Sequence, residues 1–287
     1  MKSVIQHLRF PFSFLLMPVY LFGVSEIPSL SQQNYTSLCV LFIVLHVLVY
    51  PSSNAYNSTQ DQDQGSIGLI EKPLPPSNHL VWVTLLMDAV ALILSVCINF
   101  PTACIVALYI VFSRLYSYRK IRIKKYPILG FLTVFFFQGA VVFCLPQVAL
   151  NLSFSLINIP LALAASCLIG AIYPLSQIYQ HEQDKADGVQ TLSLKLGYRG
   201  TFIFSGVLFL LGTTLFLWQK ILQQHMLAIN IFLTCQLPTI LFFIYWFLRV
   251  EKNVHEANYR NTMRMNLIAA ACMLLCFTWL ILNQINL

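Results

Sequence analysis

Charged residues are scarce in this chain. Only 9% of its 287 residues are Asp, Glu, Lys or Arg, whereas a soluble domain carries about 25%. In the same chain, 58% of the residues are hydrophobic. This balance excludes an ordinary water-soluble domain and predicts that lipid surrounds most of the chain.

Paired cysteine motifs are also missing. The eight cysteines include no Cys-x-x-Cys pair, and all of them lie in or beside apolar segments. Cys272 and Cys276 are four residues apart, but no His or third Cys accompanies them. We therefore expect the cysteines to be small buried hydrophobic residues rather than metal ligands.

Long apolar segments, in contrast, are abundant. A bilayer core needs about 20 apolar residues per helix, and nine candidate segments can be identified. They lie at approximately 8–25, 36–52, 79–97, 100–114, 127–146, 155–176, 201–219, 226–248 and 264–284. The sequence thus predicts an all-α polytopic membrane protein, a nine-transmembrane-helix bundle in which residues 1–287 form one integral-membrane domain.

Basic residues fall almost entirely on one side of this predicted bundle. The N-terminus and the alternate loops on its side hold 16 of the 17 basic residues, and Lys220 is the exception. Positive charge concentrates on the cytoplasmic side of membrane proteins, so we expect a cytoplasmic N-terminus. The net charge of +7 is explained by anionic membrane lipid and requires no nucleic acid partner.

A first acidic stretch, "SNAYNSTQDQDQGSIGLIEKPLPP", follows the second apolar segment. If the helix continues into it, one face carries four polar side chains at spacings of three and four residues: Asn54, Asn57, Ser58 and Asp61. Asp61 and Asp63 direct oxygen ligands toward a common point. Magnesium binds one or two carboxylates and completes its shell with water and phosphate oxygens, so this stretch favours a magnesium site.

A second acidic stretch, "YQHEQDKADGVQTLSLKLG", follows the sixth segment. A helix here places Gln180, Asp184 and Asp187 on one face. Glu182 and Lys185 point away from that face. Gly188 is expected to end or bend this helix, and the next element begins at Thr191–Leu192. Ordinary solvated loops are the alternative, but rows of Asn, Asp and Gln at two helix ends favour a metal site.

A basic stretch, "RLYSYRKIRIKKYP", follows the fourth segment. Lys120, Arg122, Lys124 and Lys125 alternate there with apolar residues. Alone, this stretch is typical of a positive-inside anchor. Beside two acidic loops it favours diphosphate binding, because carboxylate-held metal ions and Lys or Arg together stabilise a departing diphosphate.

These three stretches resemble the motifs of the UbiA superfamily of intramembrane prenyltransferases, which are nine-helix proteins with aspartate-rich loops after helices two and six. The second acidic stretch matches the family at Asp184, Gly188, Thr191, Leu192, Leu196 and Gly197, with Gln180 where the first aspartate is usual. The first matches at Asn54, Asp61, Asp63, Lys72 and Pro73, with Ala55 and Ser58 where aspartates are usual. The basic stretch is similar to the Tyr-Ser and Lys/Arg run after the fourth helix of the family.

The resemblance implies that an isoprenyl group is transferred from a prenyl diphosphate to an aromatic or other lipophilic acceptor, as in quinone biosynthesis. It implies Mg²⁺ as cofactor, held by Asp61, Asp63, Asp184 and Glu182. The catalytic residues it implies are Asp61, Asp63, Asp184 and Asp187. The diphosphate-binding residues it implies are Asn54, Asn57, Lys72, Lys120, Arg122, Lys124 and Lys185. We expect a bacterial inner-membrane protein whose active-site loops face the cytoplasm.

Two alternatives remain open at this point. A transporter or lipid-binding protein could use the same charges, although transporters place polar groups near the bilayer midplane and these lie at one surface. A degenerate family member could bind prenyl diphosphate without turnover, as Ala55, Ser58 and Gln180 indicate.

One acidic residue lies inside an apolar segment. Asp88 is placed in the third span, within "TLLMDAVAL". An ionisable group at such a position is costly and marks a functional site by default. We favour a bond to a neighbouring helix over polarisation of the acceptor.

Overall fold

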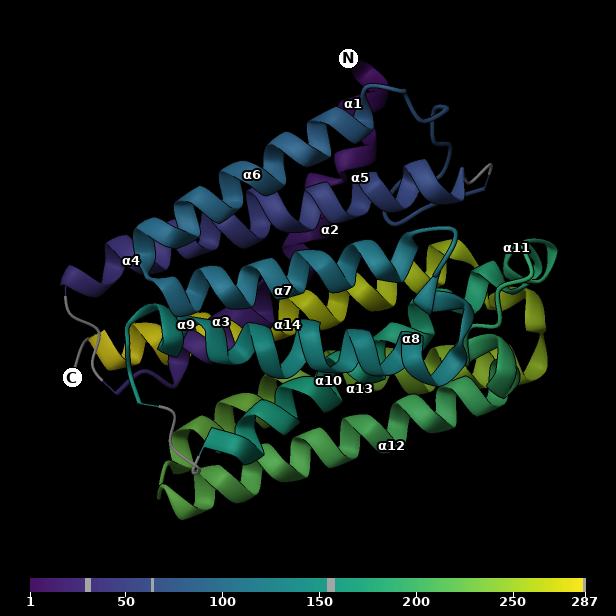
Figure 1. Ribbon diagram of the computed structural model, residues 1–287. Helices are drawn as coiled ribbons and strands as arrows, with labels where there is room; N and C mark the ends of the chain where they lie inside the picture. Colours follow the sequence, from purple (N-terminus) through teal and green to yellow (C-terminus); the bar gives the residue numbers. More distant parts are fainter. Residues whose placement is uncertain (29–31, 63–64, 154–157, 286–287) are drawn as a thin grey trace. The chain divides into compact units, whose positions relative to one another are not determined.

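A computed structural model describes residues 1–28, 32–62, 65–153 and 158–285 (Figure 1). Within these ranges, nine helical stretches are long and apolar enough to cross a membrane. They cover Lys2–Ser25, Asn34–Asp61, Leu80–Ile98, Phe100–Ser117, Pro127–Ala149, Ile159–Ala186, Leu192–Leu222, Met226–Lys252 and Tyr259–Asn283. The prediction of an all-α membrane fold with nine spans is confirmed for the described residues.

Several of these stretches consist of shorter helices in succession. The first five are built from α1 (Lys2–Leu8), α2 (Phe10–Ser13), α3 (Met17–Ser25), α4 (Gln32–Phe42), α5 (Tyr50–Asp61), α6 (Leu80–Ile98), α7 (Phe100–Ser117), α8 (Pro127–Val134) and α9 (Val142–Ala149). The last four are built from α10 (Ile159–Gln177), α11 (His181–Ala186), α12 (Leu192–Leu222), α13 (Met226–Lys252) and α14 (Tyr259–Ile285). Turns of other helix types join some of them, as described below.

The chain groups into two compact units. The first comprises Met1–Met17, Ile27–Ile123 and Leu145–Ser153. The second comprises Pro18–Glu26, Lys124–Cys144 and Phe154–Leu287. The first acidic stretch belongs to the first unit and the second acidic stretch to the second. That residues 1–287 form one domain stays a prediction.

In the first unit, α5, α6 and α7 pack against one another, and Figure 1 shows α6 running beside α5. Asn99 separates α6 from α7. Its side-chain oxygen caps α7 by accepting the backbone N–H of Thr102 at 2.8 Å. Its amide nitrogen donates to the carbonyls of Val148 and Ala149 at 2.9 and 3.1 Å. The third and fourth apolar segments are therefore distinct spans.

A π-helical segment, η2 (Ile43–Val49), joins α4 to α5. The backbone N–H of Tyr50 donates to the carbonyl of Leu45, five residues earlier. Pro51 follows immediately, offers no N–H, and its ring clashes with the carbonyl four residues earlier in a regular α-helix. The helix therefore widens before the proline, and α5 begins with its rotation offset from that of α4.

Close helix contacts in the second unit depend on small residues. Gly139, in the π-helical segment η4 (Phe135–Val141), lies against α10: a Cβ built on it would be 2.4 Å from Cα of Ser166. Gly212 of α12 faces α10 similarly, with Cβ of Cys167 at 3.0 Å. Small residues at these positions allow backbones to approach closely, which membrane helices need because packing drives their association.

An ion pair joins the end of α3 to the end of α12 within the second unit. Nζ of Lys220 donates to both carboxylate oxygens of Glu26 at 2.7 Å, and to Oε1 of Gln223 at 2.9 Å. The two charged side chains are each 5% exposed. The ring of Phe216 lies 5.8 Å from Nζ. The single basic residue on the predicted outer side is thus paired and buried.

The cysteines only partly match the prediction that all are buried. Cys167, Cys272 and Cys276 are buried, whereas three others are exposed in this structure: Cys39, Cys97 and Cys104. These three lie on helix faces that the chain itself does not cover. In a membrane helix such faces meet lipid, which suits a small apolar thiol as well as protein does.

Candidate functional site

The first acidic stretch lies on α5, which continues without interruption from Tyr50 to Asp61. The helix ends at Gln62, whose left-handed backbone (φ 53°) lets its N–H bond the carbonyl of Ser58. Asn54, Asn57 and Asp61 therefore share one helix face, as predicted. Ala55 and Ser58, at the usual aspartate positions, are 0% and 2% exposed. Asp63 lies outside the described residues.

Asp61 and Asn57 both bond to groups that follow or end α7. Nη2 of Arg122 lies 3.2 Å from Oδ1 of Asp61, and the two side chains are 14% and 4% exposed. The hydroxyl of Ser117 donates to Oδ1 of Asn57 at 2.8 Å. The structure thus brings one predicted metal ligand, Asp61, together with one predicted diphosphate ligand, Arg122.

Arg9 also contacts the first acidic stretch, although the sequence pattern did not indicate this. Its backbone is left-handed (φ 47°) between α1 and α2, and its Nη2 donates to the carbonyl of Asn54 at 2.9 Å. The amide of Asn54 in turn donates to Oγ of Ser13 at 3.3 Å. In the sequence, Arg9 is one of the basic residues that follow the positive-inside distribution. Pro11, two residues later, is the signal that the helix breaks here.

The remaining predicted cations of the first unit lie apart from these contacts. Lys72 and Lys120 are exposed. The backbone carbonyl of Lys72 accepts a long hydrogen bond from Nε2 of Gln6 at 3.5 Å. The exposed side chains of Lys72 and Lys120 are able to reach a polyanion.

The second acidic stretch is less regular than predicted. The helix tightens to a 3₁₀ turn, η6 (Ile178–Gln180), before the short α11 begins at His181. Gln180 therefore lies in the tight turn, Asp184 lies inside α11, and Asp187 lies just past its end. Glu182, Lys185 and Asp187 are exposed, whereas Asp184 is partly buried.

Asp184 is fixed by the start of the next helix. Its Oδ2 accepts the hydroxyl of Thr191 at 3.1 Å, and its backbone carbonyl accepts the N–H of Val189 at 2.8 Å. Gly188 supplies the left-handed conformation (φ 64°) needed for this turn, with no atom within 4 Å of a Cβ built on it. Thr191 also caps α12, accepting the N–H of Leu194 at 3.3 Å. The predicted break at Gly188 and helix start at Leu192 are confirmed.

A buried hydrogen-bond chain anchors α11 and was not foreseen. Nε2 of His181 lies 2.8 Å from Oγ of Ser193, which lies 3.0 Å from Oγ1 of Thr201. His181 is 4% exposed and its ring packs 4.7 Å from that of Tyr198. The only sequence signal was a histidine within the polar run. Lys124, like Lys185 a predicted diphosphate-binding residue of this unit, is partly buried.

The chemistry of the two acidic stretches can be compared with what magnesium needs. Among the described residues, no three His, Cys, Asp or Glu side chains are grouped so that they could hold a metal together. Magnesium takes one or two carboxylates and keeps its other positions for water and substrate phosphates. Asp61 and Asp184, each fixed by a hydrogen-bonding neighbour, are carboxylates suited to that role.

A model of the UbiA prenyltransferase family matches residues 14–268. No curated protein matches the sequence.

Solved structures of low sequence identity share the fold. A UbiA homologue from Archaeoglobus fulgidus bound to DMAPP and Mg²⁺ is 16% identical, with a TM-score of 0.66 over 97% of this chain and 99% of its own. A digeranylgeranylglyceryl phosphate synthase is 21% identical, with a TM-score of 0.62 over 100% and 99%. The apo structure of a UbiA homologue from Aeropyrum pernix K1 is 15% identical, with a TM-score of 0.63 over 92% and 97%.

Proposed function

Because this chain belongs to the UbiA prenyltransferase family, we propose that it transfers an isoprenyl group from a prenyl diphosphate to a lipophilic or aromatic acceptor. The observation that carries the proposal is the Asp61–Arg122 pair at the end of an apolar helix. A carboxylate and a guanidinium held side by side suit a magnesium diphosphate, which needs both a metal ligand and a counter-cation. The A. fulgidus homologue solved with GPP and Mg²⁺ supports this substrate class.

Magnesium, when bound, neutralises the diphosphate oxygens and stabilises the diphosphate as a leaving group. In our proposal its protein ligands are Asp61, Asp63 and Asp184, with Glu182 as a further carboxylate. We assign Asp187 the role of a further catalytic carboxylate. The hydrogen bond from Thr191 holds Asp184 in place, so that this carboxylate needs little reorganisation before it binds.

Lys and Arg side chains complete the diphosphate site. We assign this role to Arg122, Lys120, Lys124, Lys72 and Lys185, together with the amides of Asn54 and Asn57. Arg9 supports the group because it bonds the backbone of Asn54. These cations offset the negative charge that grows on the diphosphate as the C–O bond breaks.

The isoprenyl group then leaves as an allylic cation, which aromatic ring faces stabilise by cation–π attraction. The acceptor attacks this cation at carbon, and the proton it loses passes to a base or to water. The acceptor we propose is an aromatic compound of the kind used in quinone biosynthesis. The nine apolar helices suit such a reaction, because a prenyl tail is as apolar as lipid.

The distribution of basic residues supports an orientation. We propose an inner-membrane protein of a bacterium, with the N-terminus and the two acidic loops on the cytoplasmic side. The basis is that 16 of 17 basic residues lie at the predicted inner loops.

A second function is favoured by the variant motifs. Ala55 and Ser58 are buried where aspartates are usual, and Asp61 is already paired with Arg122. A protein with these features could bind prenyl diphosphate without turnover, acting as a carrier or sensor.

The test is pyrophosphate release by purified protein in nanodiscs, with a panel of prenyl diphosphates and pooled aromatic acceptors. Release that needs magnesium and is abolished in Asp184→Asn supports the transferase. Magnesium-dependent binding without release supports the non-catalytic function. Absence of binding contradicts both.

A further inference from the structure

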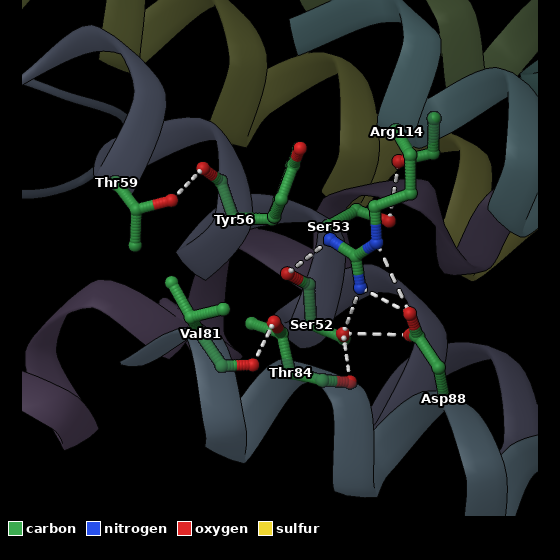
Figure 2. A network of polar contacts seen from close by, with 9 residues as sticks. Ser52, Ser53, Tyr56, Thr59, Val81, Thr84, Asp88 and Arg114 are labelled. Atoms are coloured by element: carbon green, nitrogen blue, oxygen red, sulfur yellow. Dashed lines mark hydrogen bonds and ion pairs between the residues drawn. The ribbon is translucent and has the colours of Figure 1, made fainter. Parts of the chain in front are cut away.

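Asp88 lies at the centre of a polar network between α5, α6 and α7 (Figure 2). Its Oδ2 accepts hydrogen bonds from Nε of Arg114 at 3.1 Å and from Nη2 of the same guanidinium. Its Oδ1 accepts the hydroxyl of Ser52 at 2.7 Å. Three helices therefore meet at one carboxylate.

Ser52 is the member of this network that belongs to α5. Its Oγ accepts from Nη2 of Arg114 at 2.6 Å and also lies 3.1 Å from the carbonyl of Thr84. The ring of Tyr56, one turn further along α5, packs 4.4 Å from Cζ of Arg114. The guanidinium is thus held on its edge by Asp88 and Ser52 and over its face by Tyr56.

The ion pair is largely shielded, with side-chain exposures of 18% for Arg114 and 11% for Asp88. A charge inside a membrane span is costly unless it is paired and hydrogen-bonded. Here the carboxylate accepts from both partners, so the cost is offset. A buried ion pair of this kind is often replaceable by apolar residues without loss of stability, so stability alone does not explain it.

Further hydrogen bonds continue from this network toward the acidic end of α5. Ser113 donates to Ser53 at 2.7 Å. Ser117 donates to Asn57 at 2.8 Å. Finally, Arg122 donates to Asp61 at 3.2 Å. Contacts with α7 and the segment that follows it therefore run along one face of α5.

The π-helical segment η2 explains why α5 needs such contacts. It joins α4 to α5 with a changed register, so the polar face of α5 is offset from the direction that a regular helix would give it. Asp61 lies nine residues beyond Ser52, a distance of about 14 Å along the helix. The rotation fixed at Ser52 is therefore passed along α5 to the proposed metal ligand.

We propose that Asp88, Arg114 and Ser52 are positioning residues, which set the rotation of α5 and so hold Asn57 and Asp61 in place for the magnesium diphosphate. This inference rests on the proposed function for its ligand. The positioning itself is independent of any ligand, and the two parts can be tested separately.

The first test compares Ser52→Ala with Ser95→Ala. Both serines are 0% exposed, but the hydroxyl of Ser95 on α6 donates to the carbonyl of Ala91 in its own helix. Hydrogen exchange of the backbone amides of residues 56–61 is measured in nanodiscs without ligand. We expect exchange at least about fivefold faster in Ser52→Ala and unchanged in Ser95→Ala. Equal exchange in the two variants overturns the inference.

The second test measures binding of geranyl diphosphate against magnesium concentration. We expect Ser52→Ala to need at least about fivefold more magnesium than Ser95→Ala for half-maximal binding. If Ser52→Ala shows faster exchange but needs no more magnesium than Ser95→Ala, the link between α5 and the metal is refuted. If the wild-type protein binds no member of the prenyl diphosphate panel, the proposed function fails, while the exchange comparison still decides the positioning.

A double variant separates positioning from simple stability. Asp88→Leu with Arg114→Met replaces the ion pair by apolar residues, which is often neutral for folding. We expect this variant to keep the wild-type unfolding temperature in detergent. We also expect it to need more magnesium than the wild type for half-maximal binding, as in Ser52→Ala. A double variant with both the wild-type unfolding temperature and the wild-type magnesium requirement contradicts the inference.

Discussion

The guanidinium of Arg122 lies 3.2 Å from the carboxylate of Asp61, and both side chains are largely buried. Arg122 has a left-handed backbone (φ 48°), a conformation that is uncommon for residues other than glycine. The turn after α7 therefore directs this cation back to the end of α5. The proposed metal ligand and the proposed diphosphate counter-charge thus lie adjacent within one unit.

Replacing Arg122 with Gln is expected to weaken prenyl diphosphate binding. A hydrogen bond to a charged group contributes about 1.5–3 kcal/mol, so the KM for the diphosphate substrate should rise about tenfold or more. Arg260→Gln is the matched control, because Arg260 is exposed and has no proposed role. A similar KM in both variants would show that Arg122 does not bind the substrate.

Thr191 is expected to support Asp184 and α12 at the same time. Thr191→Val removes the hydroxyl that donates to Asp184 and that caps the N–H of Leu194. Loss of a helix cap costs about 1 kcal/mol, and the magnesium requirement for pyrophosphate release should rise several-fold. Thr191→Ser keeps the hydroxyl and should restore both properties. A serine variant as impaired as valine contradicts this role.

Gly139→Ala should destabilise the second unit. The added Cβ would lie 2.4 Å from Cα of Ser166, and overpacking of this kind costs about 1–3 kcal/mol. Gly206→Ala is the control, because its Cβ would meet only Phe243 at 3.7 Å and alanine favours a helix. Thermal unfolding in detergent should give a lower midpoint for Gly139→Ala alone. Equal midpoints would mean that η4 and α10 separate easily.

The Glu26–Lys220 pair should show strong coupling. Lys220→Met leaves a buried carboxylate without its cation, which costs about 3–5 kcal/mol, whereas an apolar pair in its place is often tolerated. We therefore expect Lys220→Met to lower the unfolding midpoint and Glu26→Leu combined with Lys220→Met to recover most of it. Additive losses in the double variant would contradict a direct interaction.

Local sequence patterns predicted much of the fold. Hydropathy located the nine spans found among the described residues. The polar spacing after the second segment suits a continued helix, and α5 does continue to Asp61. Gly188 and Thr191 marked a helix break and a helix start, because a left-handed turn and an N-cap each depend on one residue type.

Interactions between distant residues could not be predicted in this way. Glu26 and Lys220 are 194 positions apart, and nothing local to either residue indicates the other. The predicted span ends near Arg114, at the start of the basic stretch, but α7 continues to Ser117, so Arg114 lies within the helix and pairs with Asp88. The bond between helices favoured for Asp88 is present, although its partner was not foreseen.

Helix irregularities were also beyond the sequence pattern. The π-helical segment η2 has the same apolar composition as a regular span, since hydropathy does not distinguish i→i+5 from i→i+4 bonding. The 3₁₀ turn at Gln180 likewise altered the predicted face of Gln180, Asp184 and Asp187.

The most direct test of the account is equilibrium binding of radiolabelled geranyl diphosphate to the protein in nanodiscs, with and without magnesium. We expect magnesium to strengthen binding by about a hundredfold or more and expect both Asp61→Asn and Asp184→Asn to remove that increase. Glu251→Gln should keep it, because Glu251 is a partly exposed carboxylate that pairs loosely with Arg199 at 3.8 Å. Magnesium-independent binding, or an unchanged increase in both aspartate variants, would contradict the proposed site.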